Sequence, residues 1–287
     1  MNTIEAISEI LKREGVEYLS CFPTTPVIEA AAAAGIRPIV CRQERVGVGI
    51  ADGYSRVTDG EVPGVFAMQY GPGAENAYPG VATAFSDSTP MLLLPLGHPR
   101  ERQGIIPHFN SVANYAGVTK HIEQINMASR TSQVMRRAFA GMHQGRVGPV
   151  MVEIPADVAL EEVDETAFFW SQKVRRVASQ GDPTDVEAAA RALCGSRYPV
   201  IHAGQGVLYA RAYDELIELA ELLQVPVMTT LLGKSSFPET HPLALGSGTG
   251  VMSGPVYHFV RRADVMFGIG CSFTRHGMSM NIPRARP

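Results

Sequence analysis

The 287-residue sequence has only four cysteines, and no two of them form a Cys-x-x-Cys pair. Widely spaced cysteines in apolar surroundings are typical of core side chains in a reduced protein, which argues against a disulfide framework or a cysteine-bound metal. No apolar run reaches the roughly 20 residues that a membrane span needs. The N-terminus carries acidic residues where a signal peptide would have a basic start. These absences predict a cytoplasmic protein.

A strong excess of charge of one sign is also missing. Lysine and arginine total 25 against 28 aspartate and glutamate residues, so the formal net charge is -3. This balance offers no electrostatic reason to expect binding to nucleic acid or to an anionic membrane. With 45% hydrophobic and 18% charged residues, the composition is that of a globular chain with one large or two medium domains.

Helical patterns alternate with short apolar runs throughout residues 1–160. The expected strands are 18–22, 38–41, 64–69, 91–96 and 149–154. The expected helices are 3–14, 26–34, 45–57, 74–87 and 129–144, and residues 97–117 are expected to be irregular. Continuous apolar strands without alternation are typical of a parallel sheet that helices cover on both faces. The pattern therefore predicts a doubly wound α/β domain.

A second unit is expected after a linker. Residues 161–185 are charged and have no clear period, as in an extended linker. The pattern then restarts in residues 186–287, with helices at 184–193 and 210–223 and strands at 200–203, 227–230 and 263–269. About three parallel strands without a closing helix are few for a finished domain. We therefore expect a second doubly wound domain that is truncated at its C-terminus.

Glu44 is the most informative residue. It stands where an expected strand runs into a helix that contains Gly47, Gly49 and Gly53. Each glycine in a helix interior costs roughly 1 kcal/mol relative to alanine, so these three predict a close approach by another backbone or a ligand. Burial at such a junction disfavours a carboxylate, whereas the helix N-terminus favours it. From these residues alone, Glu44 is equally well explained as a helix cap that pairs with a neighbouring arginine.

Polar or irregular loops follow four of the expected strands. They are residues 22–25, 43–44, 71–76 and 97–100. In a parallel sheet, the loops that follow strands lie along one edge, and ligands bind there where the strand order reverses. The four loops together predict a binding site at this edge.

Several motifs, taken in order, resemble the thiamine-diphosphate enzyme family, and in particular its acetolactate synthase-like branch. The motifs are Glu44 with residues 49–56, and then residues 71–76, 87–90 and 148–158. Residues 199–206, 215–223, 226–232 and 237–243 resemble the central domain of that family. The resemblance covers essentially the whole chain. It implies a pyrimidine-binding domain in residues 1–160 and a nucleotide-binding-like central domain in residues 186–287.

The resemblance implies a catalytic role for Glu44. In the family, a glutamate at this position hydrogen-bonds N1′ of the cofactor's aminopyrimidine and promotes the imino tautomer, whose nitrogen removes the C2 proton. The residues expected to contact the cofactor are Pro23, Thr24, Gly71, Pro72, Gly73 and Asn76. The substrate-side candidates are Thr25, Phe109, Asn110 and His98.

Two of these assignments depart from the family pattern. Residues 23–25 read Pro-Thr-Thr where the family has Pro-Gly-Gly, and Asn110 stands where many acetolactate synthases have glutamine. Asn76 is explained equally well as a cap of the helix that follows it. His98, like His108 and His121, could be a surface or core histidine.

The second unit contains a weak nucleotide motif. Its glycines form a near miss to Gly-x-Gly-x-x-Gly, with Tyr209 in the last position. In acetolactate synthases the central domain holds FAD, so the resemblance allows FAD here. The implied contacts are Gly204, Gln205, Gly206, Thr230, Leu231 and Arg275. A vestigial nucleotide fold that only spaces two catalytic domains explains the motif equally well.

The family binds Mg²⁺ and the cofactor's diphosphate in a separate C-terminal domain, through a Gly-Asp-Gly motif and a later asparagine. No such motif follows the central domain here, so no metal ligand is expected in this chain. The family shares its active sites between subunits. The resemblance therefore implies a homodimer or homotetramer, a small 2-oxoacid substrate, and a chain that is inactive alone.

Three functions follow as hypotheses. The first is thiamine-dependent decarboxylation and carboligation of 2-oxoacids, with this chain supplying the half-site of Glu44. The second is a simple decarboxylase or a flavin-bearing oxidase on the same scaffold. The third is a non-catalytic nucleotide-binding or regulatory subunit.

Overall fold

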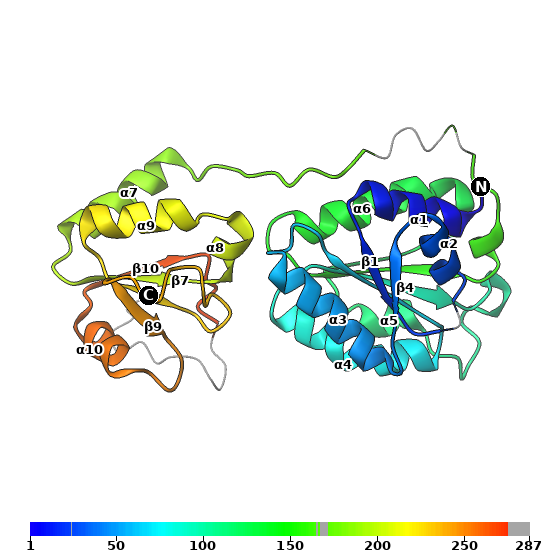
Figure 1. The fold of residues 1–287 in the computed structure, drawn as a ribbon, viewed down its shortest axis with the longest axis horizontal. Helices are drawn as coiled ribbons and strands as arrows, with labels where there is room; N and C mark the ends of the chain where they lie inside the picture. The colour runs from blue at the N-terminus through cyan, green and yellow to red at the C-terminus, as the bar shows by residue number, and fades with distance from the viewer. Residues whose placement is uncertain (24, 165, 167–171, 275–287) are drawn as a thin grey trace. The chain divides into compact units, whose positions relative to one another are not determined.

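The computed structural model describes residues 1–23, 25–164, 166 and 172–274 (Figure 1). The chain divides into two compact units, Met1–Val177 and Ala178–Pro287. Both units are built on parallel sheets, which confirms the predicted fold class of two α/β domains in tandem. Among the described residues, no helix has the length and apolar character that crossing a membrane requires.

The first unit contains a six-stranded parallel sheet with the order β2-β1-β3-β4-β6-β5. Its strands are β1 (Tyr18–Cys21), β2 (Arg37–Val40), β3 (Gly64–Met68), β4 (Met91–Gly97), β5 (His121–Gln124) and β6 (Pro149–Pro155). β3, β4 and β6 are buried along their whole length, as their apolar sequences predict. The chain moves outward from β1 to β2 and then crosses to β3 on the other side. The carboxyl ends of β1 and β3 are therefore the place where such folds bind ligands.

Helices cover both faces of this sheet (Figure 1). One apolar core joins the sheet to α1 (Thr3–Arg13), α2 (Val27–Ala33) and α6 (Thr131–His143). A second core, on the opposite face, joins it to α3 (Glu44–Val57), α4 (Pro72–Ser86) and α5 (Ser111–Tyr115). Short 3-10 turns lie at Arg100–Arg102, Ala128–Arg130 and Val158–Leu160. The loops that follow β2 and β3 thus lead directly into the helices of the second face.

Close packing of α3 on β3 explains one of the three glycines of that helix. A Cβ atom on Gly47 would lie 2.2 Å from the ring of Phe66. Gly49 and Gly53 have no described atom within 4 Å of such a Cβ, because both lie on the outward side of α3. The expected close approach is therefore present at Gly47, and among the described residues nothing approaches Gly49 or Gly53 in this way.

The second unit has a four-stranded parallel sheet with the order β10-β7-β8-β9. Its strands are β7 (Pro199–Ala203), β8 (Val227–Thr229), β9 (Ala244–Ser247) and β10 (Val265–Ile269). Its helices are α7 (Pro183–Gly195), α8 (Gln205–Ala210), α9 (Tyr213–Leu223) and α10 (Gly254–Arg262). The described sheet has one strand more than the sequence predicted.

The elements that the sequence pattern missed are short and polar. β5 and β9 are partly exposed along their whole length and lie at the edges of their sheets, so they lack the apolar run that marks a central strand. α5 lies within the stretch predicted to be irregular. The helix predicted at 210–223 is α9, which begins at Tyr213. Arg211, with a left-handed conformation and φ 55°, separates it from α8, a short helix that the sequence pattern missed.

Two histidines with lowered pKa values, one buried and one partly buried, make the stability of the fold depend on pH. Burial and, to a smaller extent, nearby cationic side chains together lower the pKa of His143, at the end of α6, to about 4. Burial likewise lowers the pKa of His202, in β7, to about 4. In the unfolded chain each pKa is about 6.5, so the unfolded state binds more protons below that pH. The free energy of unfolding should therefore fall as the pH falls from about 6.5 to about 4.

The variant His202→Leu tests this dependence. Neither ring nitrogen of His202 has a hydrogen-bond partner among the described residues, so leucine removes the proton uptake without breaking a bond. Thermal unfolding from neutral pH to about pH 5 should show less acid destabilisation in this variant than in the wild type. His258→Leu, at an exposed position on α10, is the control. Equal acid sensitivity of His202→Leu and the wild type would contradict the prediction.

Candidate active site

Glu44 is a buried carboxylate at the start of a helix. It is the first residue of α3, directly after the N-cap residue Gln43, and only 4% of it is exposed. No ion pair joins Glu44 to an arginine in the described part of the chain, and both neighbouring arginines are exposed. Its position in the first turn of α3 is the positive end of the helix dipole, which favours a carboxylate. The structure thus places Glu44 inside the protein rather than in a surface ion pair.

The first turn of α4 holds the side chain of Glu44. Asn76 donates a hydrogen bond from Nδ2 to Oε2 of Glu44 at 3.3 Å. A Cβ atom on Gly73 would lie 3.5 Å from Oε1 of Glu44 and 2.8 Å from Cγ of Gln69. One carboxylate oxygen therefore accepts a hydrogen bond from the side-chain amide of Asn76, and the other faces the backbone of Gly73, which has no side chain.

The loop before α4 has a conformation that requires glycine. Gly71 is the N-cap of α4, with φ 60° and ψ -113°, and Pro72 begins the helix. A Cβ atom on Gly71 would meet no described atom within 4 Å, so the backbone here is open. The buried hydroxyl of Tyr115 donates to the carbonyl of Ala74 at 2.5 Å and fixes the helix start from the side of α5. Sequence reasoning did not identify Tyr115 because its role depends on a contact between distant segments.

The loop after β1 is only partly defined. Thr24 lies outside the described residues, and Pro23 is exposed. Thr25 is 5% exposed, and its Oγ1 accepts a hydrogen bond from the amide of Val27 at 3.4 Å. The Thr25 hydroxyl is therefore engaged at the start of α2.

His98, a substrate-side candidate, lies in a column of three rings. His98 and His108 are stacked, with ring centroids 4.3 Å apart and an interplanar angle of 6°. Tyr70, which directly precedes Gly71, lies 4.6 Å from His98 on a tilted plane. Burial, together with the adjacent His108 and Arg102, lowers the pKa of His98, which favours its neutral form at neutral pH. The column connects the loop after β4 to the loop that carries Gly71.

Asn110 is used as a helix cap. Its Oδ1 accepts a hydrogen bond from the amide of Ala113 at 2.9 Å at the start of α5. Phe109, the residue before it, packs against the apolar core that α3 and α4 share with the sheet. The structure therefore gives both residues a packing or capping role beside the candidate site.

The glycines of the nucleotide motif are explained by backbone packing. A Cβ atom on Gly204 would lie 2.3 Å from the carbonyl oxygen of Gly270, and one on Gly206 would lie 2.6 Å from its Cα. Gln205 donates to the hydroxyl of Tyr209 at 2.6 Å. The described part of this loop thus packs on the loop after β10, which explains both glycines without a bound dinucleotide.

The other candidates for this motif give no further support. Thr230 accepts a hydrogen bond on Oγ1 from the amide of Gly233 at 2.9 Å, which closes a turn. Leu231 is exposed, and Arg275 lies outside the described residues. Over the ranges that the structure describes, no group of three or more His, Cys, Asp or Glu could hold a metal ion.

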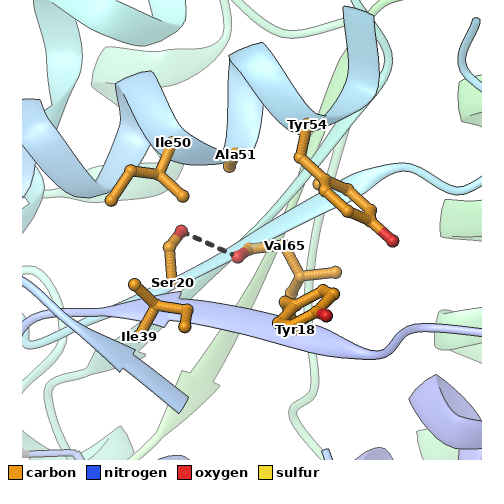
Figure 2. A pocket seen from close by; sticks show the side chains of 8 residues that line it. Tyr18, Ser20, Ile39, Ile50, Ala51, Tyr54 and Val65 are labelled. Atoms are coloured by element: carbon orange, nitrogen blue, oxygen red, sulfur yellow. Dashed lines mark hydrogen bonds between the residues drawn. The ribbon is translucent and has the colours of Figure 1, made fainter. Parts of the chain in front are cut away.

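A separate apolar cavity of about 290 Å³ lies under α3 (Figure 2). Tyr18 and Gly64, which begin β1 and β3, place it at the amino ends of the strands, away from Glu44. Ser20 lies in its wall and donates to the carbonyls of Gly47 at 2.8 Å and Val65 at 3.0 Å. The hydroxyl of Ser20 is therefore already bonded within the fold.

The chain matches two domain families of thiamine enzymes. Residues 1–128 match the thiamine pyrophosphate enzyme, N-terminal TPP binding domain, and residues 186–287 match the thiamine pyrophosphate enzyme, central domain. Both matches name the same family, in the order of the two units described above.

Curated relatives agree with these matches. The probable acetolactate synthase large subunit of Methanocaldococcus jannaschii is 35% identical over 283 residues, which cover 96% of this chain and 48% of that protein. The acetolactate synthase of Arthrospira platensis is 33% identical, with coverages of 93% and 48%. The acetolactate synthase isozyme 3 large subunit of Escherichia coli is 30% identical, with coverages of 98% and 51%. The chain spans about half the length of these relatives, and it belongs to the thiamine pyrophosphate enzyme family, in its acetolactate synthase-like branch.

Proposed function

We propose that the first unit binds the aminopyrimidine of thiamine diphosphate and that Glu44 activates the cofactor by a hydrogen bond to N1′. One observation carries this proposal: a carboxylate that is 4% exposed lies at the carboxyl edge of the sheet, held by Asn76 and facing the bare backbone of Gly73. A buried acid without an ion-pair partner is disfavoured unless it serves a ligand or an equivalent hydrogen-bond partner. The match to a TPP binding domain supports the same ligand.

Each residue of this site has a distinct task in the proposal. Asn76 fixes the orientation of the Glu44 carboxyl group by binding one of its oxygens. The other oxygen holds or releases a proton at N1′. Gly73 and Gly71 leave room for the ring, because neither presents a side chain to it. When bound, thiamine diphosphate supplies an acidic C2 carbon and an acceptor for the negative charge left by decarboxylation. A positioned acid-base group of this kind contributes about 10² to 10⁴ in rate.

The proposed reaction is decarboxylation of a 2-oxoacid and transfer of the remaining unit to a second 2-oxoacid. The names of the relatives, which are acetolactate synthases, support this substrate class. In the proposal, Mg²⁺ and the diphosphate are bound by a domain outside these 287 residues, and the site is shared between subunits of a homodimer or homotetramer.

An activity assay tests whether these residues supply only one part of the active site. In the presence of thiamine diphosphate and Mg²⁺, a protein that joins these residues to a diphosphate-binding domain should convert two molecules of pyruvate into one acetolactate and one carbon dioxide. The 287-residue chain alone should release neither acetolactate nor carbon dioxide above the uncatalysed rate. Turnover by the chain alone would contradict the proposed half-site.

The outer surface of α3 supports the proposed subunit contact. Val46, Ile50 and Val57 are 52%, 38% and 81% exposed, and their spacing places them on one side of the helix. Gly49 and Gly53 lie on the same side with no described atom near them, so a second helix could approach closely. This apolar stripe begins at Val46, two residues after Glu44.

The variant Ile50→Lys tests the contact. A charge at the centre of the stripe should weaken self-association at least about tenfold, because burying an unpaired lysine costs more than roughly 1.4 kcal/mol. Sedimentation equilibrium measures the association constant. Leu222→Lys, at an exposed leucine of α9, is the matched control and should leave self-association unchanged. An equal effect of the two variants would argue against a contact at α3.

A further inference from the structure

A second buried carboxyl group lies close to the candidate site and has no role in the function proposed above. Glu153 is in β6, whose residues are all buried, and it is 7% exposed. A carboxyl group in such a strand is costly unless its oxygens are hydrogen-bonded. The partners of Glu153 are therefore informative.

Three segments meet at the side chain of Glu153. Gln124, in β5, donates from Nε2 to Oε1 of Glu153. Ser111, the first residue of α5, forms a second side-chain hydrogen bond with it. Gly97, the last residue of β4, lies directly against it: a Cβ atom there would be 2.8 Å from Cγ and 2.9 Å from Cδ of Glu153. No side chain larger than hydrogen fits between Gly97 and this carboxyl group.

The residues next to these partners are the substrate-side candidates. His98 directly follows Gly97, and Asn110 directly precedes Ser111. His98 stacks on Tyr70, which precedes the cofactor loop at Gly71. A continuous series of contacts therefore runs from Glu153 to the loop beside Glu44.

The surroundings of Glu153 favour its protonated form. Burial raises the pKa of Glu153, and the bonds from Gln124 and Ser111 only partly oppose this. The groups that face it from β5, α5 and β4 are Gln124, Ser111 and Gly97, and all three are uncharged. A neutral carboxyl group can donate one hydrogen bond and accept others, so it can join several segments at once.

We propose that Glu153 is a positioning residue that holds the ends of β4 and the start of α5 together and thereby fixes His98 and Asn110 beside the cofactor site. The assignment of His98 and Asn110 to the substrate side of that site rests on the proposed function. The contacts of Glu153 with β4, β5 and α5 lie within this chain, so they can be tested without any cofactor.

Proton NMR of the histidine ring signals in the 287-residue chain tests whether Glu153 holds His98 in its stacked position. In Glu153→Ala, the His98 signal should lose the shift caused by its stacked neighbours and move to the position of an exposed histidine. In Glu153→Gln, which keeps the shape and neutrality of the protonated acid, the His98 signal should keep its stacked position. The wild-type His98 signal should also show a second inflection, from the ionisation of Glu153, at a pH higher than that at which an exposed glutamate titrates, and Glu153→Gln should remove it. The titration of His98 itself, influenced by His108 and Arg102, should remain in both the wild type and Glu153→Gln.

Glu14→Gln is the matched control. Glu14 is 6% exposed, accepts hydrogen bonds from the amide of Val174, and also has a pKa raised by burial. It is the C-cap residue of α1, on the opposite face of the sheet. It should leave the His98 signal and its inflection unchanged. A persistent inflection in Glu153→Gln, or an equal loss in Glu14→Gln, would overturn the proposal. If Glu153→Ala does not fold, the proposal is tested by comparing the His98 inflection of Glu153→Gln with that of the wild type. Because no cofactor is present, either result is independent of the role of Glu44.

Discussion

Glu44→Gln should lower turnover by about 10² to 10⁴ in a protein that joins these residues to a diphosphate-binding domain. Glutamine keeps the size of the side chain and can still accept the hydrogen bond from Asn76. An amide cannot exchange a proton with N1′ in the way that a carboxyl group can. The loss should therefore appear in kcat, with little change in the affinity for thiamine diphosphate or in the melting temperature.

The control for this prediction is Glu75→Gln, which changes an exposed acid in the same first turn of α4. It removes the same formal charge near the site without touching the Glu44 carboxyl group. Its turnover should equal that of the wild type. Near-normal turnover of Glu44→Gln, or an equal loss in Glu75→Gln, would contradict the proposed role.

Gly64→Ala should have the largest effect on stability. A Cβ atom on Gly64 would lie 1.9 Å from the carbonyl oxygen of Ala51, so the start of β3 or the middle of α3 would have to move. The same junction is held by Ser55, whose Oγ accepts from the Gly64 amide at 2.7 Å and donates to the carbonyl of Pro90 at 2.5 Å. Overpacking typically costs 1 to 3 kcal/mol, and a clash between backbones should cost about 3 kcal/mol or more.

Gly53→Ala, in the same helix, is the matched control. No described atom lies within 4 Å of a Cβ at this position, so alanine adds no clash and lowers the entropy of the unfolded chain. It should stabilise the isolated chain by about 0.5 to 1 kcal/mol. Urea unfolding measures both variants. Similar free energies of unfolding for the two would show that α3 does not rest on β3 as described.

The sequence predicted the parts of the fold that depend on local pattern. The apolar runs of β3, β4 and β6 are central buried strands, as expected from their composition. β5 was missed because its sequence, His-Ile-Glu-Gln, has one apolar residue and lies at a sheet edge. β9 was missed for a similar reason, since a glycine and a serine interrupt its short apolar segment. Edge strands are defined by their partner more than by their own sequence.

Topology explains why part of the candidate site could also be predicted. The loops after β2 and β3 lie on the same edge of a parallel sheet, so Glu44, Gly73 and Asn76 were expected together, and they are in contact. Tyr115 and Glu153 could not be found in this way. Each acts through hydrogen bonds to distant segments, which no local spacing encodes.

Asn110 shows where resemblance and local physics differ. By resemblance it stands in place of a substrate-side glutamine, and in the structure its side-chain oxygen Oδ1 caps α5. Asparagine before a short helix is a strong N-cap signal, so the sequence Asn-Ser-Val-Ala contained the information for this role. A capped Asn110 fixes the start of α5, the same segment that Ser111 joins to Glu153.

The carboxyl group of Glu44 is proposed to form a hydrogen bond with N1′ of the cofactor. A crystal structure of the assembled protein with thiamine diphosphate and Mg²⁺ measures this contact directly. We expect the oxygen of Glu44 that faces Gly73 to lie about 2.6 to 3.2 Å from N1′, with Asn76 still bonded to the other oxygen. A pyrimidine bound away from Glu44, or an N1′ that faces a different group, would contradict the claim.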